Sequence, residues 1–271
     1  MDGWAAVGDA GALRASGVFV AEGRRVIQRV LDGASGGAAS VVAALATPAA
    51  AAALGLEALG DRLEVRSPAE LQSLTGYNFH RGALALVRRP PPASPAAIVD
   101  AVLSNDSTGD VPPRTAPAVF VVGERIADAD NVGSLFRNAQ AFGARAVLLD
   151  DRSADPLYRK AVRTSLGAVL MTPWAQATMP DLLAALKAAG VASIGLTPDP
   201  QAPTLVDVVA AAPRGQPVAL LVGNEGDGLS SEARAACDRL ARIPMAPAAD
   251  SLNVATAFAV AAYEFSRDPR S

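Results

Sequence analysis

The chain of 271 residues is long enough for one large domain or for two domains of ordinary size, each with an ample core. Its formal net charge of −3 excludes the overall basic character that is usual for nucleic-acid binders, so any contact with nucleic acid must come from local clusters of arginine. Three clusters are visible: Arg24-Arg25 with Arg29, Arg62 with Arg66, and Arg81 with Arg88-Arg89. The alternative is that these arginines are only solvated and are balanced by acids nearby.

The scarcity of cysteine and histidine limits the chemistry further. The single cysteine, Cys237, excludes an internal disulfide and agrees with a reducing cytoplasm. Together with one histidine, His80, it cannot form a structural zinc site, so we expect no metal. No nucleophile elbow accompanies His80, which argues against a hydrolase triad and leaves it as an exposed or RNA-contacting residue.

No membrane segment or signal peptide is expected. The first residues lack a basic region followed by an apolar core. The longest uncharged stretch, residues 33–56, is rich in alanine and is interrupted by Pro48. We therefore expect a cytoplasmic protein.

The first 89 residues predict a small α/β unit. Apolar runs at residues 18–20, 40–45, 63–66 and 82–87 predict strands. Helices are expected between them, at residues 22–31 and after the Thr47-Pro48 and Ser67-Pro68 pairs, because proline is favoured at the first position of a helix. Residues 90–117 are rich in Pro, Ser, Asp and Gly and predict a linker, with a brief helix at residues 96–103.

The remaining residues, 118–271, predict a second α/β domain with a parallel sheet. Strands are expected at residues 118–122, 146–149, 168–171, 191–196, 218–222 and 241–243. Helices are expected at residues 131–142, 155–163, 180–189, 230–240 and 253–265. Regular alternation of strands and helices requires a parallel sheet covered on both faces.

One predicted helix, in residues 129–143 (ADNVGSLFRNAQAFG), gathers groups suited to an anion. Asn131 is expected to cap its first turn. Arg137 shares a face with Gly133, and helical side chains lean toward the N-terminus, so its guanidinium is directed toward Asn131. Such a helix start suits an RNA phosphate or a developing oxyanion. The alternative is an ordinary capped amphipathic helix with one solvated arginine.

A glycine-rich segment at residues 221–230 (LVGNEGDGLS) directly follows a predicted strand. Its glycines allow the backbone to approach a flat ligand closely, although an ordinary turn would use the same residues. No Gly-x-Gly-x-x-Gly fingerprint follows the first strand of this half, and there is no Gly-Lys-Ser/Thr loop, so NAD and ATP are disfavoured.

These two segments, followed by residues 243–245 (IPM) and 251–255 (SLNVA), resemble in this order the three motifs of the SpoU-type (TrmH-like) RNA ribose 2′-O-methyltransferases of the SPOUT superfamily. The resemblance covers residues 118–264. Weaker matches at residues 19–23, 74–76 and 80–85 are similar to the L30-like substrate-binding domain that often precedes the catalytic domain of this family.

The resemblance implies a fold, a cofactor and partners. It implies a deep trefoil knot in the second domain, an exception to the rule that chains avoid threading. It also implies S-adenosylmethionine as the cofactor, ribosomal or transfer RNA as the substrate, and a homodimer, for which the alanine-rich face of residues 253–265 could pack against a partner helix. The implied cofactor-binding residues are Leu196, Thr197, Gly223, Ile243 and Leu252. For Ile243 and Leu252 a purely structural role is the alternative, because both are apolar.

The implied catalytic residues are Asn131, Arg137, Glu225, Ser251 and Asn253. The family often describes the arginine of its first motif, here Arg137, as the base. Because a guanidinium stays charged at ordinary pH, we favour stabilisation of the alkoxide by Arg137, with an RNA phosphate or water receiving the proton. Asn131 would orient the ribose or Arg137, and Glu225 would pair with Arg137, the alternative for Glu225 being a solvated cap. Ser251 and Asn253 would cap the last helix and bond the ribose, and for Ser251 capping alone is the alternative.

The chain departs from the family pattern at two places. Residues 128–131 read Asp-Ala-Asp-Asn where many members have Asp-Pro-Gly-Asn, and Ala255 replaces a frequent serine. Neither change removes a group that we assign to the chemistry. The sequence thus predicts an RNA 2′-O-ribose methyltransferase. The alternatives are a non-catalytic RNA-binding or ribosome-assembly protein with the same fold, and a small-molecule nucleotide-binding enzyme.

Overall fold

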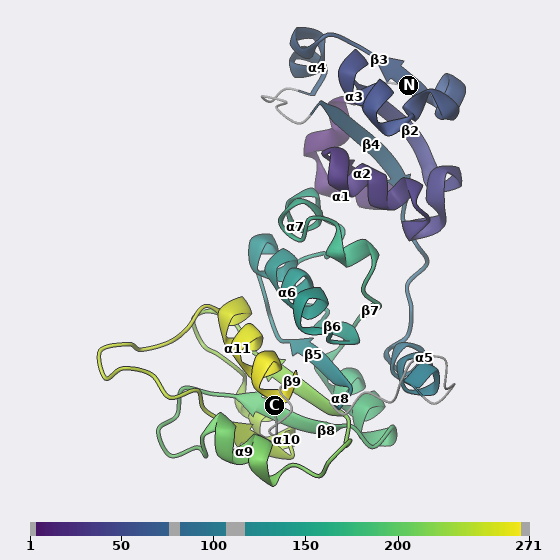
Figure 1. Cartoon of the computed structure of the whole chain (residues 1–271). Helices are drawn as coiled ribbons and strands as arrows, with labels where there is room; N and C mark the ends of the chain where they lie inside the picture. The colour runs from purple at the N-terminus through teal and green to yellow at the C-terminus, as the bar shows by residue number, and fades with distance from the viewer. Residues whose placement is uncertain (1–3, 76–81, 107–116, 267–271) are drawn as a thin grey trace. The chain divides into compact units, whose positions relative to one another are not determined.

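The computed structural model describes residues 4–75, 82–106 and 117–266. His80 and Arg81 lie outside the described residues. The chain divides into two compact units: residues 1–91 with residues 155–171, and residues 92–154 with residues 172–271 (Figure 1). Among the described helices, none combines the length and the apolar composition that a membrane span requires.

The first unit is a four-stranded sheet with helices around it. The strands are β1 (Val18–Glu22), β2 (Val41–Ala46), β3 (Leu63–Val65) and β4 (Ala83–Arg88), in the order β1-β4-β2-β3. The central strand β4 runs antiparallel to both β1 and β2, whereas β3 runs parallel to β2. The helices are α1 (Ala10–Ala15), α2 (Arg24–Leu31), α3 (Pro48–Leu54), α4 (Pro68–Thr75) and α7 (Arg159–Thr164).

Local sequence explains where these helices begin. The Thr47 hydroxyl accepts a hydrogen bond from the amide of Ala50, and Pro48 occupies the first position of α3, so the predicted start is confirmed. The helix predicted from residue 22 begins two residues later. Glu22 still belongs to β1, and Gly23 turns the chain with a φ of 89°, a conformation that favours glycine.

Residues 155–171 leave the second half of the sequence and pack in the first unit. Asp155 forms an ion pair with Arg89 at 2.8 Å, and the Nε of Arg159 lies 3.4 Å from the buried carboxylate of Glu22. The strand predicted at residues 168–171 is wrong, because this stretch is a short 3₁₀ helix, Ala168–Leu170, after the left-handed residues Leu166 and Gly167. A four-residue apolar run does not distinguish a buried turn from a strand.

The second unit contains a six-stranded parallel sheet, as predicted. Its strands are β5 (Val119–Gly123), β6 (Ala146–Asp150), β7 (Trp174–Ala177), β8 (Ala192–Leu196), β9 (Val218–Val222) and β10 (Arg239–Ala241). Their order is β10-β8-β9-β5-β6-β7, and each pair of neighbours is parallel. β5 and β9 are buried along their whole length, as expected for strands covered on both faces.

Helices cover both faces of this sheet (Figure 1). They are α5 (Pro95–Asp106), α6 (Ala129–Phe142), α8 (Met179–Ala188), α9 (Leu205–Ala211), α10 (Ser231–Ala236) and α11 (Val254–Ser266). On one face, Val99 of α5 and Leu182 of α8 join Phe120 of β5 in one apolar core. On the other face, α6 and α11 pack against each other and against the strands.

Two elements of this unit differ from the sequence prediction. The helix predicted at residues 230–240 ends at Ala236, and β10 begins at Arg239 instead of at residue 241. The carboxylate of Asp238 accepts hydrogen bonds from the amide and the hydroxyl of Ser193, which brings the following residues into register with β8. Ile243 therefore lies in the loop after the strand.

Cys237 lies just after α10 and is partly buried. Its thiol donates a hydrogen bond to the carbonyl of Ala233 at 3.2 Å. Burial, with smaller contributions from the negative charges of Asp238 and Glu124, raises the pKa of this thiol to about 11. A protonated thiol at neutral pH makes Cys237 a structural residue and not a nucleophile.

Candidate functional site

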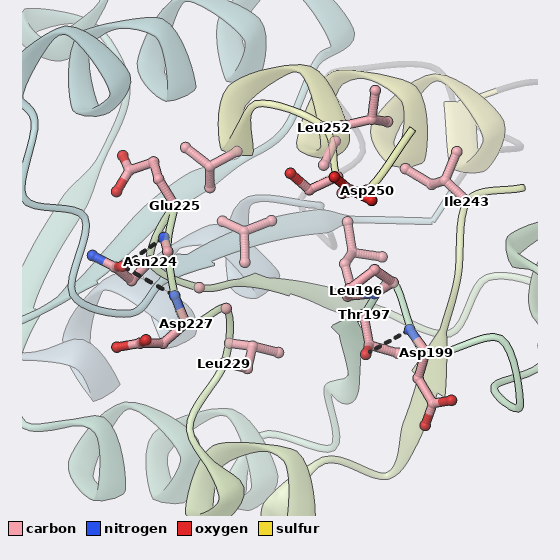
Figure 2. Close-up of a pocket in the computed structure, with 18 of the residues that line it drawn as sticks. Leu196, Thr197, Asp199, Asn224, Glu225, Asp227, Leu229, Ile243, Asp250 and Leu252 are labelled. Carbon is pink, nitrogen blue, oxygen red and sulfur yellow. Dashed lines mark hydrogen bonds between the residues drawn. The ribbon is translucent and has the colours of Figure 1, made fainter. Parts of the chain in front are cut away.

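A cavity of the second unit with a volume of about 520 Å³ lies where β8 and β9 end (Figure 2). Ligands of open parallel sheets commonly bind at the carboxyl ends of the strands. The cavity wall comes from the loop after β8, the turn after β9, and the chain from residue 243 into the start of α11. All five residues predicted to bind the cofactor line it: Leu196, Thr197, Gly223, Ile243 and Leu252.

The turn after β9, residues 223–228, is sterically restricted to glycine at its first position. A Cβ atom on Gly223 would lie 2.1–2.3 Å from the backbone of Gly228 and Leu229, a distance that no real Cβ tolerates. The turn is closed by a hydrogen bond from the amide of Gly228 to the carbonyl of Asn224 at 2.9 Å. The chain therefore folds back on itself and presents its main chain to the cavity.

The loop after β8 is fixed from both sides. Thr197 is buried, and its amide donates to the carbonyl of Ala241 in β10 at 3.0 Å. Its hydroxyl accepts a hydrogen bond from the amide of Asp199 at 3.2 Å (Figure 2). The apolar side chain of Leu196 and the polar main chain around Thr197 thus form one wall of the cavity.

Beside the cavity, three predicted catalytic residues form one hydrogen-bonded group. Asn131 donates through its side-chain nitrogen to the carboxylate of Glu225, and its oxygen accepts from the side chain of Asn253 at 2.9 Å. Asn131 belongs to α6, Glu225 to the turn after β9, and Asn253 directly precedes α11. In sequence, Asn131 is 94 positions from Glu225 and 122 positions from Asn253. Glu225 also lines the cavity, so this group borders it.

The structure corrects the predicted cap of α6. Asp128, and not Asn131, caps this helix, with its carboxylate accepting from the amide of Asp130 at 2.9 Å. Asn131 lies in the first turn, so its side chain is available to Glu225 and Asn253. Asp is among the best residues for a helix cap, and Asp128 is a residue of this stretch that agrees with the family pattern.

The last helix is capped as predicted for Asn253. Its side-chain oxygen accepts hydrogen bonds from the amides of Ala255 and Thr256 at 3.0 and 3.3 Å. The same side chain donates to Asn131, so it has both of the tasks that the sequence suggested. Ser251 lines the cavity.

The comparison with protein families decides the assignment. The model of the SpoU rRNA Methylase family matches residues 118–263, which is more than half of the chain. The chain belongs to this family. The match contains β5 to β10 and every residue that we predicted for the site.

Relatives of this SpoU family member share most of its length. A protein of Mycobacterium bovis, named an uncharacterised tRNA/rRNA methyltransferase, is 40% identical over 193 residues, which is 71% of this chain and 62% of the relative. The chain thus spans about three fifths of that relative.

Solved structures agree. The SpoU methyltransferase AviRb from Streptomyces viridochromogenes, in complex with AdoMet, is 26% identical with a TM-score of 0.76, and the match covers 97% of this chain and 95% of AviRb. A structure named RNA 2′-O ribose methyltransferase is 27% identical with a TM-score of 0.72, and the match covers 97% of this chain and 94% of that one.

Arg137 is exposed on α6, two turns after Asn131. The predicted ion pair between Arg137 and Glu225 is not among the contacts of the described residues, in which Glu225 instead accepts from Asn131. The guanidinium of Arg137 therefore has no partner within the described part of the chain that would hold it away from a substrate.

Sequence analysis missed several polar residues of the site. Asp199, Asp227, Asp250 and Arg234 also line the cavity. Asp199, Asp227 and Asp250 lie in the loops after strands, where ligands of parallel sheets bind, and this position was a signal for them. Arg234 lies within α10 and had no such signal. Three of the four are acidic, so the cavity favours a ligand that carries positive charge.

Proposed function

We propose that this chain is an S-adenosylmethionine-dependent methyltransferase that modifies a ribose 2′-hydroxyl of ribosomal or transfer RNA. The observation that carries the proposal is the convergence at one cavity of the five predicted cofactor residues and the Asn131–Glu225–Asn253 group. The names of the relatives, tRNA/rRNA methyltransferase and RNA 2′-O ribose methyltransferase, support the substrate class.

The cavity fits the proposed cofactor in size and chemistry. A volume of about 520 Å³ is within the range of ordinary small-molecule sites. Leu196, Ile243 and Leu252 offer apolar contacts for an adenine ring, and the main chain of the Gly223 turn offers hydrogen bonds. When bound, S-adenosylmethionine supplies a methyl group made electrophilic by its sulfonium charge, and acidic side chains at the rim suit that charge.

The chain's own residues would orient the ribose and stabilise its oxygen. Asn131 is held by Glu225 and Asn253, so its amide has a fixed direction, as pre-organised catalysis requires. Arg137 would place a positive charge beside the 2′-oxygen as it loses its proton. Because the guanidinium cannot accept that proton, an RNA phosphate or water would receive it.

The distribution of charge supports an RNA partner. The first unit has 12 basic and 9 acidic residues, a net charge of +3, whereas the second has 12 basic and 18 acidic residues, a net charge of −6. Arg24 and Arg25 are exposed at the start of α2. Burial, with a smaller contribution from the neighbouring Arg25, lowers the pKa of Arg29 from its ordinary value.

Reversing the charge at Arg24 and Arg25 (Arg24→Glu with Arg25→Glu) is therefore expected to weaken RNA binding. The affinity for unmodified ribosomal RNA should fall at least tenfold, and the slope of log affinity against log salt should decrease by about 1 to 2. Fluorescence anisotropy at several salt concentrations measures both. Arg214→Glu with Arg239→Glu makes the same change of net charge on exposed residues of the acidic unit, and equal losses in the two variants would contradict a specific role for α2.

Finer features of the fold and assembly belong to the same proposal. We propose a trefoil knot in the second domain, an L30-like fold for the first, domain boundaries at residues 89 and 118, and a homodimer. Of the alanines in residues 253–265, Ala255, Ala261 and Ala262 are buried within the chain, whereas Ala257 and Ala259 are partly exposed and Thr256, Val260 and Tyr263 are exposed. Light scattering that finds a stable monomer at micromolar concentration would contradict the dimer.

Labelled methyl transfer tests the function directly. The protein, labelled S-adenosylmethionine and RNA lacking the modification should give labelled RNA whose methyl group maps to a ribose. Cofactor binding without transfer to any cellular RNA would favour the non-catalytic RNA-binding alternative.

A further inference from the structure

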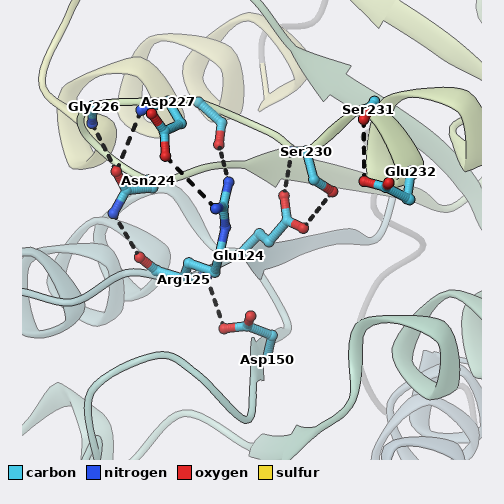
Figure 3. Close-up of polar contacts among 10 residues, drawn as sticks. Glu124, Arg125, Asp150, Asn224, Gly226, Asp227, Ser230, Ser231 and Glu232 are labelled. Atoms are coloured by element: carbon cyan, nitrogen blue, oxygen red, sulfur yellow. Dashed lines mark hydrogen bonds and ion pairs between the residues drawn. The ribbon is translucent and has the colours of Figure 1, made fainter.

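Two neighbouring residues directly after β5 hold the turn after β9 and the chain beyond it (Figure 3): Arg125 contacts the turn, and Glu124 contacts Ser230, two residues past its end. The turn and the residue after it, Leu229, line the cavity, whereas neither Glu124 nor Arg125 does. Neither residue belongs to the site predicted from sequence. Their contacts therefore bear on how the turn is held and not on direct contact with a ligand.

Arg125 binds the turn through both its main chain and its side chain. Its carbonyl accepts a hydrogen bond from the side chain of Asn224 at 3.0 Å. Its guanidinium donates to the carbonyl of Gly228 at 3.4 Å and lies 3.7 Å from the carboxylate of Asp227. One residue thus joins Asn224, near the start of the turn, to Gly228 at its end (Figure 3).

The backbone of Arg125 is itself fixed in an unfavourable conformation. Its φ of 54° lies in the left-handed region, which costs a non-glycine residue of order 1 kcal/mol or more. The amide of Arg125 donates to the buried carboxylate of Asp150 at 2.8 Å, which holds this conformation. Such strain persists only where surrounding contacts impose it.

Glu124 fixes the other end of the segment. It is buried, and its carboxylate accepts from the amide of Ser230 at 2.7 Å and from the hydroxyl of Ser230 at 2.6 Å. Ser230 in turn caps α10, so the exit of the turn is tied to a helix start.

We propose that Arg125, assisted by Glu124, is a positioning residue that pre-organises the turn at residues 223–228 for cofactor binding. The inference rests on the proposed function for the identity of the ligand. The predicted rigidity of the turn is independent of the proposed function, because it is measured without ligand.

The contacts of Arg125 with the turn differ in strength, and this difference determines which substitution tests its role. Asp227 is largely exposed, with a side-chain accessibility of 80%, so its ion pair with Arg125 contributes little. The hydrogen bond from Asn224 reaches the main-chain carbonyl of Arg125, so a change of side chain leaves it in place. The contact that such a change removes is therefore the partly buried hydrogen bond from the guanidinium to the carbonyl of Gly228. The Nε of Arg125 is buried without a hydrogen-bond partner among the described residues, so lysine at this position loses no contact made by that atom.

Arg125→Gly removes the side chain and leaves the backbone contacts. Glycine adopts a φ of 54° without strain, which offsets the greater freedom that glycine gives the unfolded chain. The thermal midpoint should therefore stay close to that of the parent. The matched control is Arg214→Gly, which removes an exposed arginine from a loop of the same unit.

The first measurement is amide hydrogen exchange of residues 224–229 in the protein without ligand. Arg125→Gly should increase exchange of these amides roughly tenfold, a factor that corresponds to one hydrogen bond of ordinary net strength. Arg214→Gly should leave it unchanged. Unaltered exchange in a folded Arg125→Gly protein would overturn the proposal.

The second measurement is the affinity for S-adenosylmethionine by calorimetry, with steady-state kinetics. The Kd and the KM for the cofactor should rise about tenfold in Arg125→Gly, with kcat at saturating cofactor changed less than threefold, and Arg125→Lys should recover most of the affinity. A fall in kcat with no change in KM would also overturn the proposal.

Two further outcomes remain interpretable. If Arg125→Gly does not fold, hydrogen exchange of residues 224–229 is measured in Arg125→Lys instead. Exchange in this variant should be faster than in the parent but should increase less than roughly tenfold. If the parent protein neither binds S-adenosylmethionine nor transfers methyl groups, the proposed function fails, whereas the exchange measurement still accepts or rejects the positioning role.

Discussion

Gly223→Ala is expected to abolish binding of the cofactor, although the substitution adds only one methyl group. The added Cβ would lie 2.1 Å from the carbonyl carbon of Gly228 and 2.2 Å from the amide nitrogen of Leu229. Both atoms are backbone and cannot rotate away. The turn must therefore open, and opening it costs several kcal/mol, as in other severe steric substitutions.

The consequence for function follows from the position of the turn. Residues 223–229 form part of the cavity wall, and Glu225 in the turn accepts from Asn131. We expect the Kd for S-adenosylmethionine to rise more than 100-fold, which corresponds to about 2.7 kcal/mol. Calorimetry measures the affinity, and circular dichroism checks that β9 and the rest of the sheet remain folded.

Gly226→Ala is the matched control in the same turn. A Cβ on Gly226 would approach only the side-chain oxygen of Asn224, at 3.3 Å, and small shifts of that side chain accommodate it. The affinity should change no more than a few fold. Parental affinity in Gly223→Ala, or equal losses in both variants, would contradict the steric argument.

The contrast between these two glycines shows what sequence could predict and what it could not. The pattern of glycines after a buried strand predicted close approach of the backbone to a ligand. It did not distinguish Gly223, where an added Cβ would collide with backbone, from Gly226, where it would meet only the side-chain oxygen of Asn224 at 3.3 Å. That difference depends on the path of residues 228 and 229, which is a property of the folded turn.

The parallel sheet was predictable because its central strands are long apolar runs. β5, β6 and β9 are completely buried, and each was recognised within one residue at either end. β7 was missed because Trp174–Ala177 contains glutamine and is only partly buried at this edge of the sheet. Helix α9 was also missed, although Thr204 and Asp207 carry the side-chain signal of a helix start, with Thr204 accepting from the amide of Asp207.

The convergence of the motifs was predicted from the family resemblance, whereas their individual contacts were not. Asn131 was expected to cap its helix and instead bonds to Glu225 and Asn253. Glu124 and Arg125 were not predicted because a charged pair after a strand has no local pattern that indicates its partners. Their partners, Ser230 and Gly228, are more than 100 residues away in sequence.

Arg137→Ala is expected to lower kcat for methyl transfer by a factor of 10² to 10³, the usual loss when one group that stabilises an oxyanion is removed. Arg137 is exposed, and alanine is a better helix former, so the thermal midpoint should stay within a degree or two. Arg137 does not line the cavity, so the Kd for S-adenosylmethionine should remain within about twofold.

The same variant distinguishes the two roles that an arginine could have. If Arg137 acts as a fixed positive charge, Arg137→Lys should retain part of the rate, because an ammonium stabilises an oxyanion although it lacks the planar fork. If Arg137 were the base, the rate of the parent would depend on deprotonation of a guanidinium and would rise steeply with pH throughout the alkaline range. Arg239→Ala, on an exposed residue of the same unit, controls for the loss of one charge. Transfer at the parental rate by Arg137→Ala would remove this residue from the mechanism and leave the Asn131–Glu225–Asn253 group as the part of the site that orients the ribose.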